Sequence, residues 1–121
     1  MNKDIISLNV PAKPEYISVV RLTTSSIANN MGFSIDDIED IKVSIAEACI
    51  NALHLNPASE ISIIYHILDE KISMIVSNVA ENIPEELDGS KERILGLLII
   101  KSLMDEVEFS ENGIEMIKYI E

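Results

Sequence analysis

The chain has 121 residues, 47% of them hydrophobic, and carries a formal net charge of −12 at pH 7. This length and apolar content suit one domain with a buried core and leave too little chain for a second domain. The acidic balance argues against a nucleic-acid partner, whose phosphates would be repelled, and it requires any bound nucleotide to come with a metal ion or local basic groups.

One strand and two helices are predicted in the first half of the chain. Residues 4–10 alternate apolar and polar side chains, as a strand does, before a proline-containing stretch. A helix is expected from Pro14 to about residue 30, because proline suits a first helical turn. A longer amphipathic helix is expected over residues 34–55, where Ser34 and Asp37 are spaced as a capping pair.

The second half is predicted to hold two hairpins separated by a loop and a helix. The expected strands are residues 61–68, 71–77, 106–109 and 114–119. Two residues join the first pair, and the second pair surrounds Asn112-Gly113, a dipeptide that favours positive φ at both turn positions. The acidic segment 78–92 contains a proline and is predicted to be a loop, and helical spacing runs from 94 to 104.

This order of elements indicates an α/β (α+β) two-layer sandwich. Helices interspersed among hairpins favour a mixed, largely antiparallel sheet with its helices on one face. The other face would then be open to solvent or to a partner. No repeat or linker divides the sequence, so residues 1–121 are predicted to form a single domain.

The compartment is predicted from two simple features. The only cysteine, Cys49, lies on the predicted apolar helix face, so a disulfide framework is excluded and a reducing compartment is expected. We recognise neither a cleavable leader nor a run of about 18 apolar residues. We therefore expect a cytoplasmic protein without a membrane partner.

The long helix carries a polar stripe beside its apolar face. Glu47 and Asn51 lie one turn apart on it, so a carboxylate and an amide oxygen can point into one cleft. An amide oxygen suits Mg²⁺, which prefers hard oxygen ligands, and the carboxylate can accept the proton of an attacking hydroxyl. On spacing alone, the alternative of two solvated side chains is the commoner one.

Three stretches of the chain together resemble one family. The run DIEDIKVSIAEACINAL at 37–53 looks like the N box of the anti-sigma-factor serine kinases of the anti-sigma-B type. These belong to the GHKL (Bergerat-fold) superfamily, with the histidine kinases and gyrase. Residues 10–33, and then LGLLIIKSLMDEVEF at 95–109 with MIKYI at 116–120, resemble the same kinases in the same order. The resemblance implies the Bergerat, or histidine kinase-like ATPase, fold.

The resemblance also implies roles for individual residues. In that family the N-box glutamate is the base toward a serine of an anti-anti-sigma factor, and the asparagine coordinates Mg²⁺; the matching positions are Glu47 and Asn51. Arg21 falls where the family has an arginine that contacts partners, although a solvated surface arginine is the alternative reading. The implied cofactors are ATP and Mg²⁺, and the implied partners are a sigma factor, an anti-anti-sigma factor and a second copy of the chain.

The chain departs from the family at its nucleotide motifs. Where the family has Asp-x-Gly beside the adenine, residues 78–80 are NVA, so Asn78 offers an uncharged oxygen and Ala80 adds a methyl group. The glycine-rich phosphate motif is reduced to LGL, which leaves Gly96 and Leu97, with Ile94 in place of a glycine. The lid between these motifs, about 79–93, is short.

Three functions remain open at this point. The intact N box favours an anti-sigma factor that uses Mg-ATP to phosphorylate a serine of an anti-anti-sigma factor. The eroded glycine motifs and short lid favour a non-catalytic protein-binding module of the same fold with a degenerate nucleotide site. Lys91 and Arg93 could partly replace the lost phosphate contacts, or they could be a solvated helix end. A nucleotide binder without transfer activity is the third reading.

Overall fold

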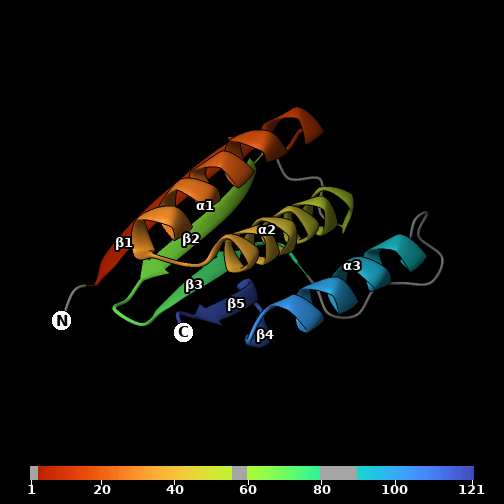
Figure 1. Ribbon diagram of the computed structural model, residues 1–121. Helices are drawn as coiled ribbons and strands as arrows, with labels where there is room; N and C mark the ends of the chain where they lie inside the picture. The colour runs from red at the N-terminus through yellow and green to blue at the C-terminus, as the bar shows by residue number, and fades with distance from the viewer. Residues whose placement is uncertain (1–2, 56–59, 80–89) are drawn as a thin grey trace.

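The computed structural model describes residues 3–55, 60–79 and 90–121, and it forms two layers (Figure 1). The elements in chain order are β1 (Asp4–Pro11), a 3-10 turn η1 (Pro14–Tyr16), α1 (Ile17–Met31), α2 (Ile35–Leu55), β2 (Glu60–Ile67), β3 (Lys71–Val76), α3 (Ser90–Leu103), β4 (Glu106–Ser110) and β5 (Gly113–Tyr119). The strands form one sheet in the order β1-β2-β3-β5-β4. All three helices cover the same face, which confirms the predicted two-layer sandwich (Figure 1).

Every strand pairing in the described part of the chain is antiparallel. The mixed character that we expected of the sheet is therefore not found there. The helices follow hairpins or precede them, and within residues 3–55, 60–79 and 90–121 no crossover joins two adjacent parallel strands. None of the described helices combines the length and apolar character that crossing a membrane requires.

The core lies between the helices and the inner face of the sheet. Strand β2 shows why, because Ile61, Ile63 and Tyr65 are buried while the residues between them are not. The hydroxyl of Tyr65 lies 2.6 Å from Thr24 Oγ1 on α1. Thr24 donates its own proton to the carbonyl of Val20, at 2.7 Å, so the tyrosine is the donor of the bond that ties α1 to the sheet.

Helix α2 begins as its sequence predicts. The hydroxyl of Ser34 accepts a hydrogen bond from the backbone N–H of Asp37 at 3.2 Å. Two aspartates in the first turn interact favourably with the positive end of the helix dipole. Helix α1 begins later than expected, since Pro14 opens the 3-10 turn and the α-helix starts at Ile17. The backbone at Pro14 first closes a 3-10 turn, which is tighter than a turn of α-helix, and the α-helix begins after it.

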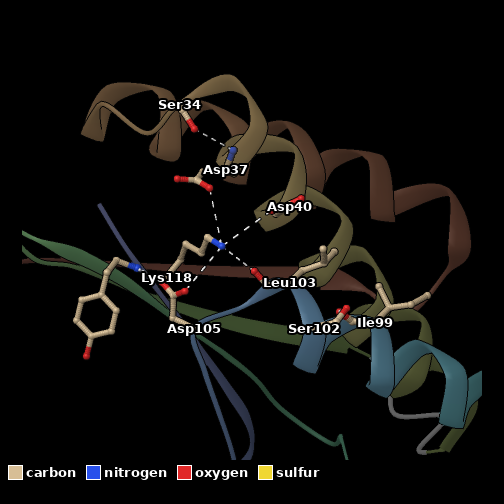
Figure 2. Close-up of polar contacts among 9 residues, drawn as sticks. Ser34, Asp37, Asp40, Ile99, Ser102, Leu103, Asp105 and Lys118 are labelled. Carbon is tan, nitrogen blue, oxygen red and sulfur yellow. Dashed lines mark hydrogen bonds and ion pairs between the residues drawn. The ribbon is translucent and has the colours of Figure 1, made fainter. Parts of the chain in front are cut away.

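A lysine of β5 joins α2 to α3 (Figure 2). Lys118 Nζ donates a hydrogen bond of 2.7 Å to the carbonyl of Leu103, the last residue of α3. The same nitrogen lies 3.8 Å from Asp37, 4.0 Å from Asp40 and 3.9 Å from Asp105. Its side chain is only 12% exposed. This contact fixes the start of α2 against the end of α3 and so sets how the two helices meet.

Both predicted hairpins are present, but the second one turns elsewhere. Ser110 pairs with Gly113, which places Glu111 and Asn112 in the turn, and of Asn112 and Gly113 only the glycine has a positive φ, at 122°. The expectation of positive φ at Asn112 is wrong, because its N–H donates to Ser110 Oγ and holds another conformation. Gly113 is required by packing, since a Cβ there would collide with the carbonyl of Val76.

Helix α3 starts earlier than its sequence pattern suggests. Residues 90–92, which we expected in the loop, are helical, and the rest of that segment, 80–89, lies outside the described residues. Good helix formers occupy positions 91–93, which are Lys91, Glu92 and Arg93. Position 94 is an isoleucine and not a glycine, so it does not interrupt the helix. The stretch where the family has a glycine-rich phosphate motif is therefore an uninterrupted helix.

Candidate functional site

Asn51 is a buried polar residue whose side chain makes no hydrogen bond with the described residues. Its side chain is only 3% exposed, and neither its amide oxygen nor its amide nitrogen has a hydrogen-bond partner among the described residues. Buried amides are normally paired, and an unpaired one costs about 1–3 kcal/mol. The buried amide therefore fits a ligand from outside the chain, and its oxygen has the chemistry that Mg²⁺ prefers.

Glu47 lies one turn before Asn51 on α2 and packs against α3. It is half-buried, and its carboxylate fills the space beside Gly96, where a Cβ would stand only 2.6 Å from Glu47 Oε1. The structure thus brings together Glu47, predicted to be the base, and Gly96, predicted to lie beside the nucleotide. Their meeting point is the contact between α2 and α3.

Two further polar groups lie along this contact. Ser44, one turn before Glu47, is fully buried, and its hydroxyl has no hydrogen-bond partner in the described part of the chain. Arg93, one turn before Gly96, is only 6% exposed. Helices α2 and α3 run in opposite directions (Figure 1), so Arg93 and Asn51 lie at the same end of the contact. Sequence reasoning had grouped Arg93 with Lys91, which the structure leaves exposed. The helical periodicity of the sequence does not show that Arg93 is buried while Lys91 is solvated.

The other predicted nucleotide residues lie differently. Asn78 lies in the turn after β3, in a left-handed conformation with φ at 63°, and is exposed. Leu97 is buried in the core, so its side chain packs rather than faces a ligand. Ala80 lies outside the described residues, as does most of the predicted short lid.

Arg21 belongs to a different surface. It lies on α1 and, with Ser18, Leu22 and Lys42, lines a shallow hollow of about 210 Å³ between α1 and α2. Two basic side chains beside an exposed leucine are a notable grouping on a protein with 21 acidic and 9 basic residues. Arg21 is exposed, which is compatible with a solvated surface arginine and with a contact to a partner protein.

Cys49 is core packing, as expected. It is fully buried on α2, and burial raises the pKa of its thiol to about 12. A thiol with so high a pKa carries almost no thiolate near neutral pH, so it is a poor nucleophile.

The sequence and the fold of the chain match a known family of proteins. A family model described as a histidine kinase-like ATPase domain matches residues 10–118. The chain belongs to the histidine kinase-like ATPase family. The Bergerat fold predicted from the N box is thereby confirmed.

The relatives most informative about this chain are named serine-protein kinase RsbW. It is 38% identical to the protein of Oceanobacillus iheyensis, over 98% of this chain and 89% of the relative. It is 36% identical to the protein of Halalkalibacterium halodurans, over 91% and 78%, and 31% identical to that of Bacillus subtilis, over 98% and 88%. The predicted similarity to serine kinases thus extends over nearly the whole chain.

A solved structure shows the same fold. The chain is similar to a Mycobacterium tuberculosis protein whose structure contains RsbU and RsbW domains, with a TM-score of 0.69 and 17% identity. The match covers 97% of this chain, which spans about a third of that protein, at 32%. At this identity the likeness concerns the fold alone.

Proposed function

We propose that the protein is a cytoplasmic anti-sigma factor and ATP-dependent serine-protein kinase of a partner-switching circuit. It binds a sigma factor and phosphorylates a serine of an anti-anti-sigma factor. The observation that carries the proposal is Asn51, a buried amide without a hydrogen-bond partner among the described residues, one turn from Glu47 on the N box. The names of the relatives support it independently.

The chain's own residues account for the parts that phosphoryl transfer needs. The Asn51 amide oxygen would hold Mg²⁺, which would neutralise part of the phosphate charge of the nucleotide. The carboxylate of Glu47 accepts the proton of the serine hydroxyl. Arg93, buried at the same end of the α2–α3 contact as Asn51, adds the local positive charge that an acidic protein needs to hold a nucleotide.

Partner binding is assigned to two surfaces. The hollow beside Arg21 and Lys42 offers two cations and an apolar side chain to an acidic segment of a sigma or anti-anti-sigma factor. The open sheet face presents Ile5 and Ile64, which are exposed although they lie on strands. A second copy of the chain would cover them, which is the physical basis for the proposed homodimer.

Calorimetry with ATP, with and without Mg²⁺, tests the nucleotide site. The wild type should bind Mg-ATP, and Asn51→Ala should lose at least tenfold in affinity only when Mg²⁺ is present. Asn29→Ala, which removes an exposed asparagine of α1, is the matched control and should bind as the wild type does. No binding by the wild type at millimolar Mg-ATP would contradict the kinase function.

Transfer is tested separately with radiolabelled ATP and a purified anti-anti-sigma factor. Glu47→Ala should lower the rate of serine phosphorylation at least a hundredfold while Mg-ATP still binds. Glu39→Ala, an exposed glutamate of the same helix, should leave the rate unchanged. Equal rates for Glu47→Ala and the wild type would remove Glu47 from the mechanism.

One observation favours a second function, the non-catalytic binding module. Helix α3 is continuous from Ser90, so the loop N–H groups that a glycine-rich motif would aim at phosphates are engaged within the helix. A wild type that captures a sigma factor but binds no Mg-ATP would support this module. In that case Arg21→Glu should still weaken the capture.

A further inference from the structure

We infer that Gly96 is a positioning residue for Glu47, and that the site uses its missing side chain rather than its backbone N–H. The glycine leaves room for the Glu47 carboxylate between α2 and α3, and so fixes where the proton of the serine hydroxyl is accepted. This role rests on the kinase function proposed above. It differs from the phosphate contact that the resemblance implies for the same residue.

The backbone of Gly96 is not free to bind a phosphate. The glycine is the seventh residue of α3, which runs from Ser90 to Leu103. Only the first four N–H groups of a helix lack an intrahelical acceptor. The N–H of Gly96 is therefore engaged with the carbonyl four residues earlier, at Glu92.

The missing side chain has a clear structural reason. A Cβ on Gly96 would stand 2.6 Å from Glu47 Oε1 and 3.6 Å from its carboxyl carbon, whereas the Cβ of Glu47 would be 3.9 Å away. Only the Glu47 carboxylate stands where a Cβ of residue 96 would collide, so the glycine makes room for this carboxylate. Glycine is also among the poorest residues for a helix interior, which makes its presence here informative.

Helix α3 cannot easily move away to make room. Leu97 and Ile100, which follow Gly96 on α3, are buried in the core, and Lys118 holds the end of the helix through Leu103. An added methyl group would therefore displace the flexible carboxylate rather than the helix. The carboxylate would have to shift by roughly 0.8 Å to reach ordinary contact at 3.4 Å. Misplacing a catalytic group by about 1 Å can cost about a hundredfold in rate.

The first experiment compares transfer kinetics in two backgrounds. Gly96→Ala should lower kcat for serine phosphorylation by about 10- to 100-fold and leave the KM for Mg-ATP within about threefold. In the Glu47→Asp background the carboxylate is withdrawn by one methylene group, so adding Gly96→Ala should lower kcat less than about threefold. Leu98→Ala, on the exposed side of α3, is the control and should leave kcat unchanged. Equal losses in both backgrounds, or an unchanged kcat for Gly96→Ala, would overturn the inference.

The second experiment needs neither nucleotide nor partner. In the Glu47→Ala background, Gly96→Ala should raise the thermal midpoint by about 3–5 °C, because alanine favours the helix and its Cβ meets nothing closer than 3.9 Å. In the wild-type background the same change should raise the midpoint less, or lower it. An equal gain in both backgrounds would show that the carboxylate does not occupy this space and would overturn the inference.

The two experiments separate the inference from the function on which it rests. If the melting midpoints depend on the Glu47 background but the wild type transfers no phosphate, the contact is real and the kinase function is wrong. The positioning role of Gly96 is then overturned together with that function. If the wild type transfers phosphate and Gly96→Ala leaves kcat unchanged, the kinase stands and only the positioning role is overturned.

Discussion

Replacing Lys118 with methionine should destabilise the protein by several times as much as replacing the surface lysine Lys42 in the same way. The lysine connects β5 to both α2 and α3 (Figure 2). Methionine keeps most of the apolar stem and removes the cation. The change therefore tests the charge and its hydrogen bond rather than the packing of the side chain.

The magnitude follows from two contributions. The hydrogen bond from Nζ to the Leu103 carbonyl, at 2.7 Å, has a charged donor in a side chain only 12% exposed, and such bonds contribute about 1.5–3 kcal/mol. The three aspartates lie 3.8–4.0 Å away and are 24–42% exposed, so solvent screening leaves each pair only a few tenths of a kcal/mol. The expected loss is about 2–4 kcal/mol, or roughly 8–15 °C in the thermal midpoint.

Urea denaturation at pH 7 measures this loss directly. Lys42→Met is the matched control, because Lys42 makes a single pair with Glu39 at 3.3 Å on the surface of α2 and should cost less than about 0.5 kcal/mol. Repeating the series in 0.5 M salt should remove only the aspartate part of the Lys118 effect. A loss for Lys118→Met no larger than that for Lys42→Met would refute the reasoning.

Three further predictions concern stability. Gly113→Ala should cost at least about 2 kcal/mol more than Gly32→Ala in urea denaturation, because both glycines have positive φ but only Gly113 has backbone where a Cβ would stand; equal costs would contradict this. Burial raises the pKa of the Cys49 thiol from 9.0 to about 12, so the stability that it contributes is fully present below pH 9 and is lost as the pH rises toward 12. Between pH 8 and pH 10 the wild type should therefore lose about 1.4 kcal/mol more than Cys49→Ala, and parallel pH profiles would exclude this cause. Tyr65→Phe should cost about 1 kcal/mol in the wild type and much less in the Thr24→Val background, because the hydroxyl pair at 2.6 Å is then already absent.

The elements of the fold could largely be predicted because their signals are local. The hairpin of β2 and β3 follows from two β-rich runs joined by two residues, and Leu68 N–H indeed donates to Lys71 O at 3.0 Å. The start of α2 follows from Ser34, whose side chain needs to reach only three residues along the chain. The starts of α1 and α3, the turn before Gly113 and the mixed character expected of the sheet differ from the prediction, because short runs of sequence set the ends of elements less sharply than their interiors.

The site could be predicted only in part, for the same reason. Spacing placed Glu47 and Asn51 on one stripe, but it gave no sign that Asn51 is buried without a described hydrogen-bond partner. The contact of Glu47 with Gly96 joins residues on different helices, and the approach of Lys118 to Asp37 joins a strand to a helix. Such contacts depend on how the helices cross above the sheet, and a periodic pattern within one helix carries no information about that crossing.

The two ends of the contact between α2 and α3 differ: Lys118 holds the helices together at one end, and buried polar side chains lie at the other. This difference affects where a ligand can bind without separating the helices. At the fixed end Lys118 holds the first turns of α2 and the last residue of α3 together. In the middle, Glu47 fills the space that Gly96 leaves open. At the other end lie Asn51, without a described partner, and the buried Arg93. Because apolar packing and an ion cluster already fix one end, a bound anion or metal ion at the polar end can change local order there without requiring the helices to separate. A net charge of −12 opposes ATP, and the buried Arg93 places one cation at this end of the contact.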